Sequence, residues 1–463
     1  MSNKIVPIWN SDGSCAEESE NKTFCMAPWS HTYISPQAER RMCCASREDH
    51  SFQKQYIDAT NDTKYGEIKE SKTLADDFNP VSLEEHWNSP YMKDIRKKLM
   101  AGERISQCDV CNDDILSISS YRKWFTGVLF RDKIQEAFDS TDDDGHTTMP
   151  VISFDYRYSN LCNFKCRMCG EQLSSSWEAE KKLNNLWTIE EQPFMQKDVK
   201  KKMTTFQTEV VEPEFREAIS KGIVEEIYWV GGEPLMYDIH WWALEEMVKN
   251  GSAKNCYLRY NSNLSRTEFK DKKLFDYLPQ FKDWLMCASI DGTGDVVEFI
   301  RKGIVWEEWL ENFKEGLAAP GGKDRMRFDL TITGPGMFSI KDLFDLSLEL
   351  DVKIETKIMF AFHSDIVFSP FAWPKHILIR KIDELLEYIE PRATKNQATL
   401  VNTLREMRTR QTFEEEHPED FTEGKKRGKE FQNKLDNIRD EKITIADIYK
   451  ADDELYEWWV SND

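Results

Sequence analysis

Short β-prone runs alternate with helical stretches over residues 151–365. Amphipathic segments such as WWALEEMVKN and KDLFDLSLEL separate the runs, as expected for helices that pack on one face. Because strands that alternate with helices form βαβ units, the pattern predicts an α/β domain with a parallel sheet. The pattern fits an open sheet and a partial barrel equally well. The predicted strands lie in the runs 151–158, 223–230, 255–262, 283–291, 326–333 and 352–360.

The rest of the chain divides into segments of different character. Residues 1–20 are interpreted as a loose tail, and residues 21–126 as a small domain that metal binding holds together. Residues 127–150 are interpreted as a linker, because they include a stretch rich in Asp, Thr and Gly. Residues 366–463 predict a helical region.

Two helices are indicated by particular residues. Ser82 and Glu85 form a capping box, which predicts one helix from Ser82 to about Met100. In the C-terminal region, HILIRKIDELLEYI has apolar residues at helical spacing, which predicts a packed helix. Its apolar stripe consists of Leu378, Ile382, Leu385, Leu386 and Ile389.

Composition narrows the class of protein. The 463 residues are 40% hydrophobic and 31% charged, which is typical of a globular chain with two or three domains. No uncharged apolar run is long enough to span a bilayer, and the first residues do not resemble a secretory signal, so we expect a cytoplasmic protein. The net charge of −21 disfavours a nucleic-acid partner.

The chain contains 11 cysteines, and most of them are clustered. Disulfides are rare in the cytoplasm, so clustered cysteines indicate metal or redox chemistry. Cys15, Cys256 and Cys287 stand alone and are interpreted as buried or incidental thiols.

Three cysteines directly follow the first predicted strand. Cys162, Cys166 and Cys169 have the spacing C-x3-C-x2-C, which places three soft ligands on one loop. A structural zinc site takes four closed ligands. A [4Fe–4S] cluster held by three cysteines instead leaves one iron open for a substrate.

This motif resembles the signature of the radical S-adenosylmethionine (SAM) superfamily. The resemblance implies that the open iron binds SAM. One electron then cleaves SAM to methionine and a 5′-deoxyadenosyl radical, which abstracts hydrogen from a substrate. The residue before the third cysteine is often aromatic in this superfamily, whereas here it is Met168.

A GGEP sequence follows the second predicted strand and is similar to the GGE motif of the same superfamily. The resemblance implies that Gly231, Gly232 and Glu233 position SAM. Polar residues near later strand ends are similar to further SAM contacts, although each could equally be a strand-end cap or a surface ion pair. These residues are Asn261, Asn263, Ser289, Asp291 and Arg301.

The N-terminal cysteines suggest a second metal site. Cys25, Cys43, Cys44, Cys108 and Cys111 fit a zinc knuckle on spacing alone. Adjacent residues of an extended chain point in opposite directions, so only one of Cys43 and Cys44 is expected to bind the same metal as the others. The segment also resembles the SPASM and twitch domains of radical SAM enzymes, which implies an auxiliary [4Fe–4S] cluster. Such a domain usually follows the barrel, whereas here it precedes it.

The resulting interpretation is a partial (β/α)6 radical SAM barrel with an N-terminal twitch-like domain and a helical C-terminal region. We expect a peptide, protein or small-molecule substrate and an electron donor such as flavodoxin or ferredoxin. The alternatives are a radical SAM enzyme that acts on RNA and a non-catalytic iron–sulfur or zinc protein. The sequence does not identify a catalytic residue that acts on the substrate.

Overall fold

The structure is a computed structural model. The predicted tail, residues 1–20, lies outside the described residues except for a short antiparallel pair, β1 (Ile8–Trp9) and β2 (Cys15–Glu17). The predicted boundary at residue 365 also lies outside them. The described ranges are 8–9, 15–17, 21–46, 80–112, 121–188, 192–359 and 366–461.

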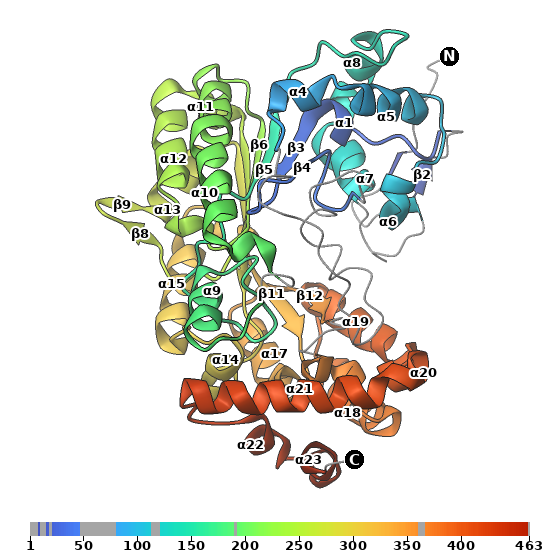
Figure 1. Cartoon of the computed structure of the whole chain (residues 1–463), viewed down its shortest axis with the longest axis vertical. Helices are drawn as coiled ribbons and strands as arrows, with labels where there is room; N and C mark the ends of the chain where they lie inside the picture. Colours follow the sequence, from blue (N-terminus) through green and yellow to red (C-terminus); the bar gives the residue numbers. More distant parts are fainter. Residues whose placement is uncertain are drawn as a thin grey trace.

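An eight-stranded sheet forms the centre of the protein (Figure 1). Its strand order is β12-β11-β10-β7-β6-β5-β3-β4, and all neighbours are parallel except β3 and β4. The predicted α/β class with a mostly parallel sheet is confirmed. In this sheet, each of the six strands that come after β4 in the sequence lies within a predicted run. The strands are β3 (His31–Ile34), β4 (Arg40–Arg41), β5 (Ser153–Tyr156), β6 (Glu226–Trp229), β7 (Tyr257–Ser262), β10 (Asp283–Ser289), β11 (Met326–Ile332) and β12 (Lys353–Ile358).

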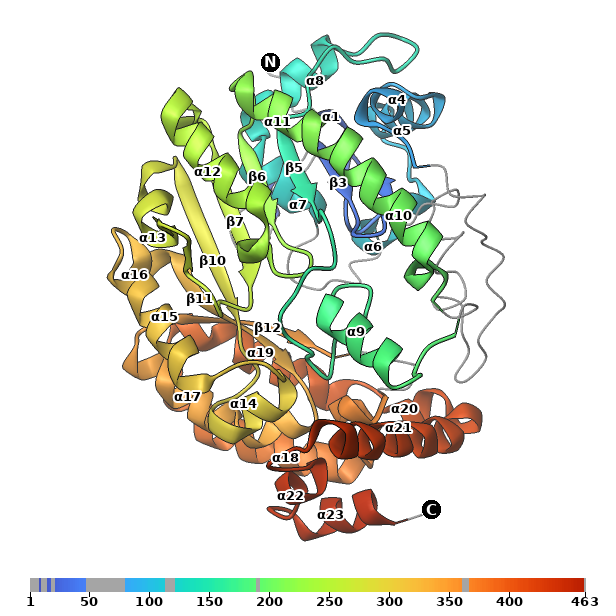
Figure 2. The ribbon, with the colours of Figure 1, turned by 60° about the vertical axis from the view of Figure 1, so that its left-hand side comes forward.

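The two faces of the sheet differ in polarity. Along β7, Leu258 and Tyr260 are buried in the main core, whereas Arg259 and Asn261 are partly buried on the opposite face. Helices cover the apolar face (Figure 2), among them α11 (Glu212–Ser220), α12 (Asp238–Asn250), α15 (Trp306–Ala318) and α17 (Ile340–Glu349). The opposite face is called the inner face below. It carries Tyr228, Arg259, Asn261, Cys287, Asp329 and Lys357.

The cysteine-rich N-terminal segment contributes to this sheet. Strand β3 pairs in parallel with β5, with His31 opposite Ser153 and Ile34 opposite Tyr156. The segment also has a hydrophobic cluster of its own around Trp29. The predicted linker, residues 127–150, includes helix α8 (Ile134–Asp139). The domain boundaries remain predictions.

The single helix predicted from Ser82 is in fact two helices. Ser82 caps α4 (Leu83–Trp87), and its capping box with Glu85 is present as predicted. A second helix, α5 (Pro90–Met100), begins at a proline and has its own N-cap, Ser89. Proline has no N–H to donate and disfavours helical geometry at the residue before it, so the chain restarts the helix there.

The C-terminal region is helical, as predicted. In α18 (Lys375–Ile389), four of the five predicted stripe residues are buried and Leu386 is partly buried. No helix in the described ranges is long and apolar enough to cross a membrane. The other helices of the region are α19 (Ala398–Thr409), α20 (Phe413–Glu416), α21 (Pro418–Arg439), α22 (Ile445–Tyr449) and α23 (Asp453–Val460).

Candidate functional site

The cysteine loop follows β5 at the carboxyl end of that strand. Helix α9 (Ser175–Leu183) and its N-cap hold this loop in place. The Ser174 hydroxyl donates to the Phe164 carbonyl oxygen at 2.6 Å, and the Trp177 indole N–H donates to the Cys166 carbonyl oxygen at 2.7 Å. The loop presents three free cysteines: Cys162, Cys166 and Cys169.

The three thiols lie close enough to affect one another. Burial raises the pKa of each thiol. For Cys162, the second largest effect is the charge of Cys166, which raises the pKa further. For Cys169, burial and the charge of Cys166 raise the pKa to about 12. The free thiols are therefore protonated at neutral pH, whereas a bound metal deprotonates its cysteine ligands. The loop thus needs a cationic group to hold it as thiolates.

The GGEP turn after β6 packs directly on the cysteine loop. The Glu233 amide donates to the Leu161 carbonyl oxygen at 2.7 Å. Gly231 has a φ of 125°, a conformation that glycine adopts readily. A Cβ atom on Gly232 would lie 2.3 Å from the Leu161 carbonyl oxygen, so only glycine fits this close approach. The turn and the residue before Cys162 therefore depend on each other's position.

Replacing Gly232 with alanine is expected to push Leu161 away and distort the cysteine loop. The free energy of unfolding should fall by about 1–3 kcal/mol, the range for overpacking a buried site. Urea unfolding and iron content measure the effect. The matched control is Gly170→Ala in the same loop, because a Cβ atom there meets nothing within 4 Å. Wild-type stability and iron content in the Gly232 variant would contradict this account.

The Glu233 carboxylate is buried and joins the GGEP turn to the end of β7. One oxygen accepts from the Ser262 hydroxyl at 2.7 Å and from the Leu235 amide at 3.0 Å. The other accepts from the Asn263 amide at 2.7 Å. Burial raises the pKa of Glu233 to about 7, while these hydrogen bonds oppose the increase. In this structure Glu233 organises the two strand ends that face the cysteine loop.

The two asparagines predicted as SAM contacts point to different places. The Asn263 amide nitrogen lies 3.8 Å from the Cys162 sulfur, so this side chain borders the cysteine loop. Asn261 instead lies on the inner face, where it accepts from the Tyr228 hydroxyl at 2.5 Å and donates to Asp329 at 2.6 Å. Only Asn263 is therefore next to a predicted cluster ligand.

Asp291 and Arg301, predicted as separate contacts, pair with each other. Arg301 Nε lies 2.7 Å from an Asp291 oxygen, and the other oxygen of Asp291 accepts from the Thr331 amide at 2.9 Å. Burial raises the pKa of Asp291, and Arg301 opposes that change. Arg301 also lowers the pKa of Cys166 against the larger effect of burial, so the pair borders the second cysteine. Ser289 is partly buried at the end of β10.

The N-terminal cysteines separate into a group of four and a single residue. Cys44 lies apart from the group, beside Tyr121 and Asp155. Burial raises the pKa of Cys25 to about 11 and that of Cys108 to about 12. The group lines one small cavity of about 20 Å³ and consists of Cys25, Cys43, Cys108 and Cys111.

The donor atoms of both cysteine groups suit an iron–sulfur cluster. Among the described residues, no three His, Cys, Asp or Glu side chains are placed to hold one metal ion. Soft thiols are the donors that such clusters take. Three thiols at one place and four at the other fit this chemistry.

Residues outside the predicted set also support the cysteine loop. Arg167 lies between two of the cysteines and is fully buried, together with Trp177. From the C-terminal region, Arg439 contacts Glu180 and Trp177 of helix α9, which holds the same loop. The sequence could have indicated a role for Arg167, because it is a charged residue inside a cysteine motif and a buried guanidinium needs partners. No local pattern could have placed Arg439 there.

Comparison with solved structures finds weak similarity. SuiB from Streptococcus suis bound to S-adenosylmethionine matches with 13% identity, 57% of this chain and 49% of that chain covered, and a TM-score of 0.33. The protein anSMEcpe with bound AdoMet and Kp18Cys peptide matches with 16% identity, 50% and 58% covered, and a TM-score of 0.32. The chain thus spans less than two thirds of either protein. At this similarity, nothing known of those proteins carries over to this chain.

Comparison by sequence gives a more definite result. A search of the curated proteins finds no match to this chain. Residues 156–336 match the family model of the Radical SAM superfamily. The match begins at the end of β5 and includes the cysteine loop, the GGEP turn and the ends of β7 and β10. The chain therefore carries a radical SAM superfamily domain over residues 156–336.

Proposed function

We propose that this protein is an enzyme that cleaves SAM reductively at a [4Fe–4S] cluster held by Cys162, Cys166 and Cys169. The observation that carries the proposal is the GGEP turn packed on a loop of three free cysteines, inside a radical SAM superfamily domain. When bound, the cluster would supply the electron that cleaves SAM, and the resulting 5′-deoxyadenosyl radical would abstract hydrogen from a substrate.

The protein's own residues would position SAM around that cluster. Gly231 and Gly232 let the backbone approach closely, and Glu233 holds the strand ends that border the loop. Asn263 borders Cys162, which supports its assignment as a SAM contact. The Asp291–Arg301 pair, near Cys166, would contribute to the SAM site as a unit. Asn261, on the inner face, and Ser289, at the end of β10, complete the set of proposed SAM contacts.

We further propose that four N-terminal cysteines hold an auxiliary [4Fe–4S] cluster in a twitch-like domain. Their shared cavity supports this proposal, and the separate position of Cys44 supports Cys43 as the ligand of that pair. A cluster with four protein ligands would act as an electron relay or a structural element. The finer architecture, a partial (β/α)6 barrel over residues 151–365, belongs to the same proposal. So does a cytoplasmic location with flavodoxin or ferredoxin as the electron donor.

For the substrate we propose a peptide or protein side chain. Charges on the inner face are paired: Arg259 lies 2.7 Å from Glu226, and Lys357 lies 2.7 Å from Asp329. A surface that binds a nucleic-acid backbone instead needs uncompensated basic residues. Balanced charges therefore favour a substrate that carries little net charge, as many peptide segments do.

The test is to purify the protein without oxygen, reduce it with dithionite and supply SAM. We expect methionine and 5′-deoxyadenosine in equal amounts, and none from the variant with Cys162, Cys166 and Cys169 all replaced by alanine. A reduced protein that neither binds nor cleaves SAM would exclude the enzyme and leave a non-catalytic iron–sulfur or zinc protein. Tight, salt-dependent binding of RNA would favour an RNA substrate over a peptide.

A further inference from the structure

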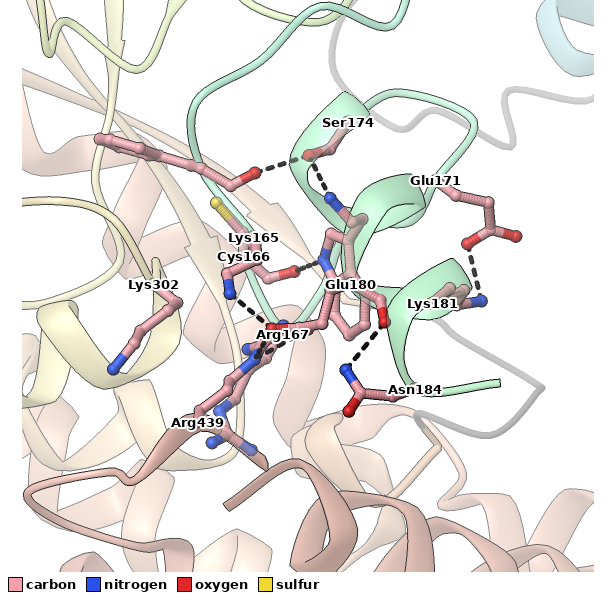
Figure 3. Close-up of polar contacts among 12 residues, drawn as sticks. Lys165, Cys166, Arg167, Glu171, Ser174, Glu180, Lys181, Asn184, Lys302 and Arg439 are labelled. Carbon is pink, nitrogen blue, oxygen red and sulfur yellow. Dashed lines mark hydrogen bonds and ion pairs between the residues drawn. The ribbon is translucent and has the colours of Figure 1, made fainter. Parts of the chain in front are cut away.

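The C-terminal helix α21 contacts the cysteine loop, although it lies outside the segment that matches the superfamily model. In both overall views α21 runs beside α9 and α14 (Gly294–Ile300), at the edge of the domain that carries the cysteines (Figures 1 and 2). Figure 3 shows that Arg167 and Arg439 meet close to Cys166. The contact therefore brings residues from the end of the chain to the candidate active site.

Arg167 forms the first half of this contact. Its side chain is fully buried, and its guanidinium donates to Gln432 at 2.8 Å, Asp436 at 2.6 Å and Glu441 at 3.1 Å. The same guanidinium lies 3.9 Å from the centre of the Phe299 ring. Among the residues that the structure describes, the polar partners of this side chain thus come from α21 or the residues just after it. The backbone between the second and third cysteines is tied to the C-terminal region.

Arg439, the last residue of α21, forms the second half. Its side chain is fully buried and forms two hydrogen bonds to one Glu180 oxygen, at 2.7 and 3.1 Å. Its guanidinium lies 4.4 Å from the centre of the Trp177 ring, and that indole donates to the Cys166 carbonyl oxygen. Lys165 also donates to Glu180, at 2.5 Å. The residues on both sides of Cys166 are therefore linked to α21.

The electrostatics of this arrangement favour a role beyond packing. Buried ion pairs add little net stability compared with apolar residues of the same shape, so stability alone does not explain them. Within the described residues, Nη1 of Arg439 is buried and has no hydrogen-bond partner. Two cations, Arg439 and Lys165, share the single carboxylate of Glu180, so this group keeps a net positive charge. A net positive charge beside cluster-binding cysteines would favour the reduced, more negative state of a cluster.

We propose that Arg167 and Arg439 are positioning residues through which helix α21 holds the cysteine loop, and that Arg439 also places positive charge beside its cluster. The inference rests on the proposed cluster at Cys162, Cys166 and Cys169. It makes the C-terminal region part of the active site, although no cluster ligand is proposed there.

The first test is the midpoint potential of this cluster in Arg439→Gln and Arg439→Lys. Loss of the charge in Arg439→Gln should lower the ratio of reduced to oxidised cluster about tenfold at a fixed potential, which is 59 mV for one electron. Arg439→Lys keeps the charge and should stay close to wild type. The control is Arg408→Gln, which removes an exposed pair with Asp383 and should change nothing. A wild-type potential in Arg439→Gln would overturn the charge effect.

The second test uses the metal-free chain, so it does not depend on cluster loading. The substitution Asp436→Asn replaces a charged partner of Arg167 with a neutral side chain of similar shape. Amide hydrogen exchange across residues 162–170 should then become about tenfold faster. Unchanged exchange in this variant would overturn the positioning role. A wild-type chain that binds no iron would instead refute the proposed function, and the exchange result would still decide whether α21 holds the loop.

Discussion

Replacing Cys166 with alanine is expected to remove about four of about eight iron atoms per chain, the content of one [4Fe–4S] cluster out of two. The same variant should lose all reductive cleavage of SAM. Two cysteines cannot hold the cluster at a site that needs three, and Cys166 is the buried central residue of the loop. Iron and sulfide content after anaerobic purification, together with the yield of 5′-deoxyadenosine, measure both effects.

The matched control is Cys256→Ala, which removes a thiol that is fully buried in the main core and outside both cysteine groups. This control should keep its iron and its activity. Retained SAM cleavage in the Cys166 variant would contradict the ligand assignment. Zinc in place of iron at both sites of the wild-type protein would contradict the proposal that it is a SAM-cleaving enzyme.

The second large effect is expected at two adjacent cysteines. Cys43→Ala should lose about four iron atoms per chain while the SAM cluster remains, whereas Cys44→Ala should lose none. Cys43 lines the cavity shared with Cys25, Cys108 and Cys111, and Cys44 lies beside Tyr121 instead. The two variants remove the same chemical group from neighbouring positions. Iron content and the electronic spectrum of the reduced protein distinguish them.

Three outcomes would revise the auxiliary site. Loss of iron from Cys44→Ala with none from Cys43→Ala would reverse the assignment. Unchanged iron in Cys43→Ala and in Cys108→Ala would exclude a cluster at this cavity. About four iron atoms together with one zinc in the wild type would make the N-terminal segment a zinc site and leave the radical SAM centre unaffected.

Much of the molecule could be predicted because its signals are local. The spacing of Cys162, Cys166 and Cys169 places three thiols on one loop whatever surrounds it. Likewise, the predicted strand at 255–262 alternates apolar and polar residues, and that alternation alone determines which side chains face the core. Pro90 also marked a helix start that sequence reasoning overlooked, although its effect is equally local.

The strands of the main sheet, the three-cysteine loop and the GGEP turn after the next strand could therefore be predicted from the sequence alone. Only long-range packing brings Cys43, and not Cys44, to the cavity that the other N-terminal cysteines line, and adds β3 to the main sheet. It also paired Arg167 with Gln432, 265 residues away. Such contacts depend on how distant elements pack, and no periodicity or spacing within a short window carries that information.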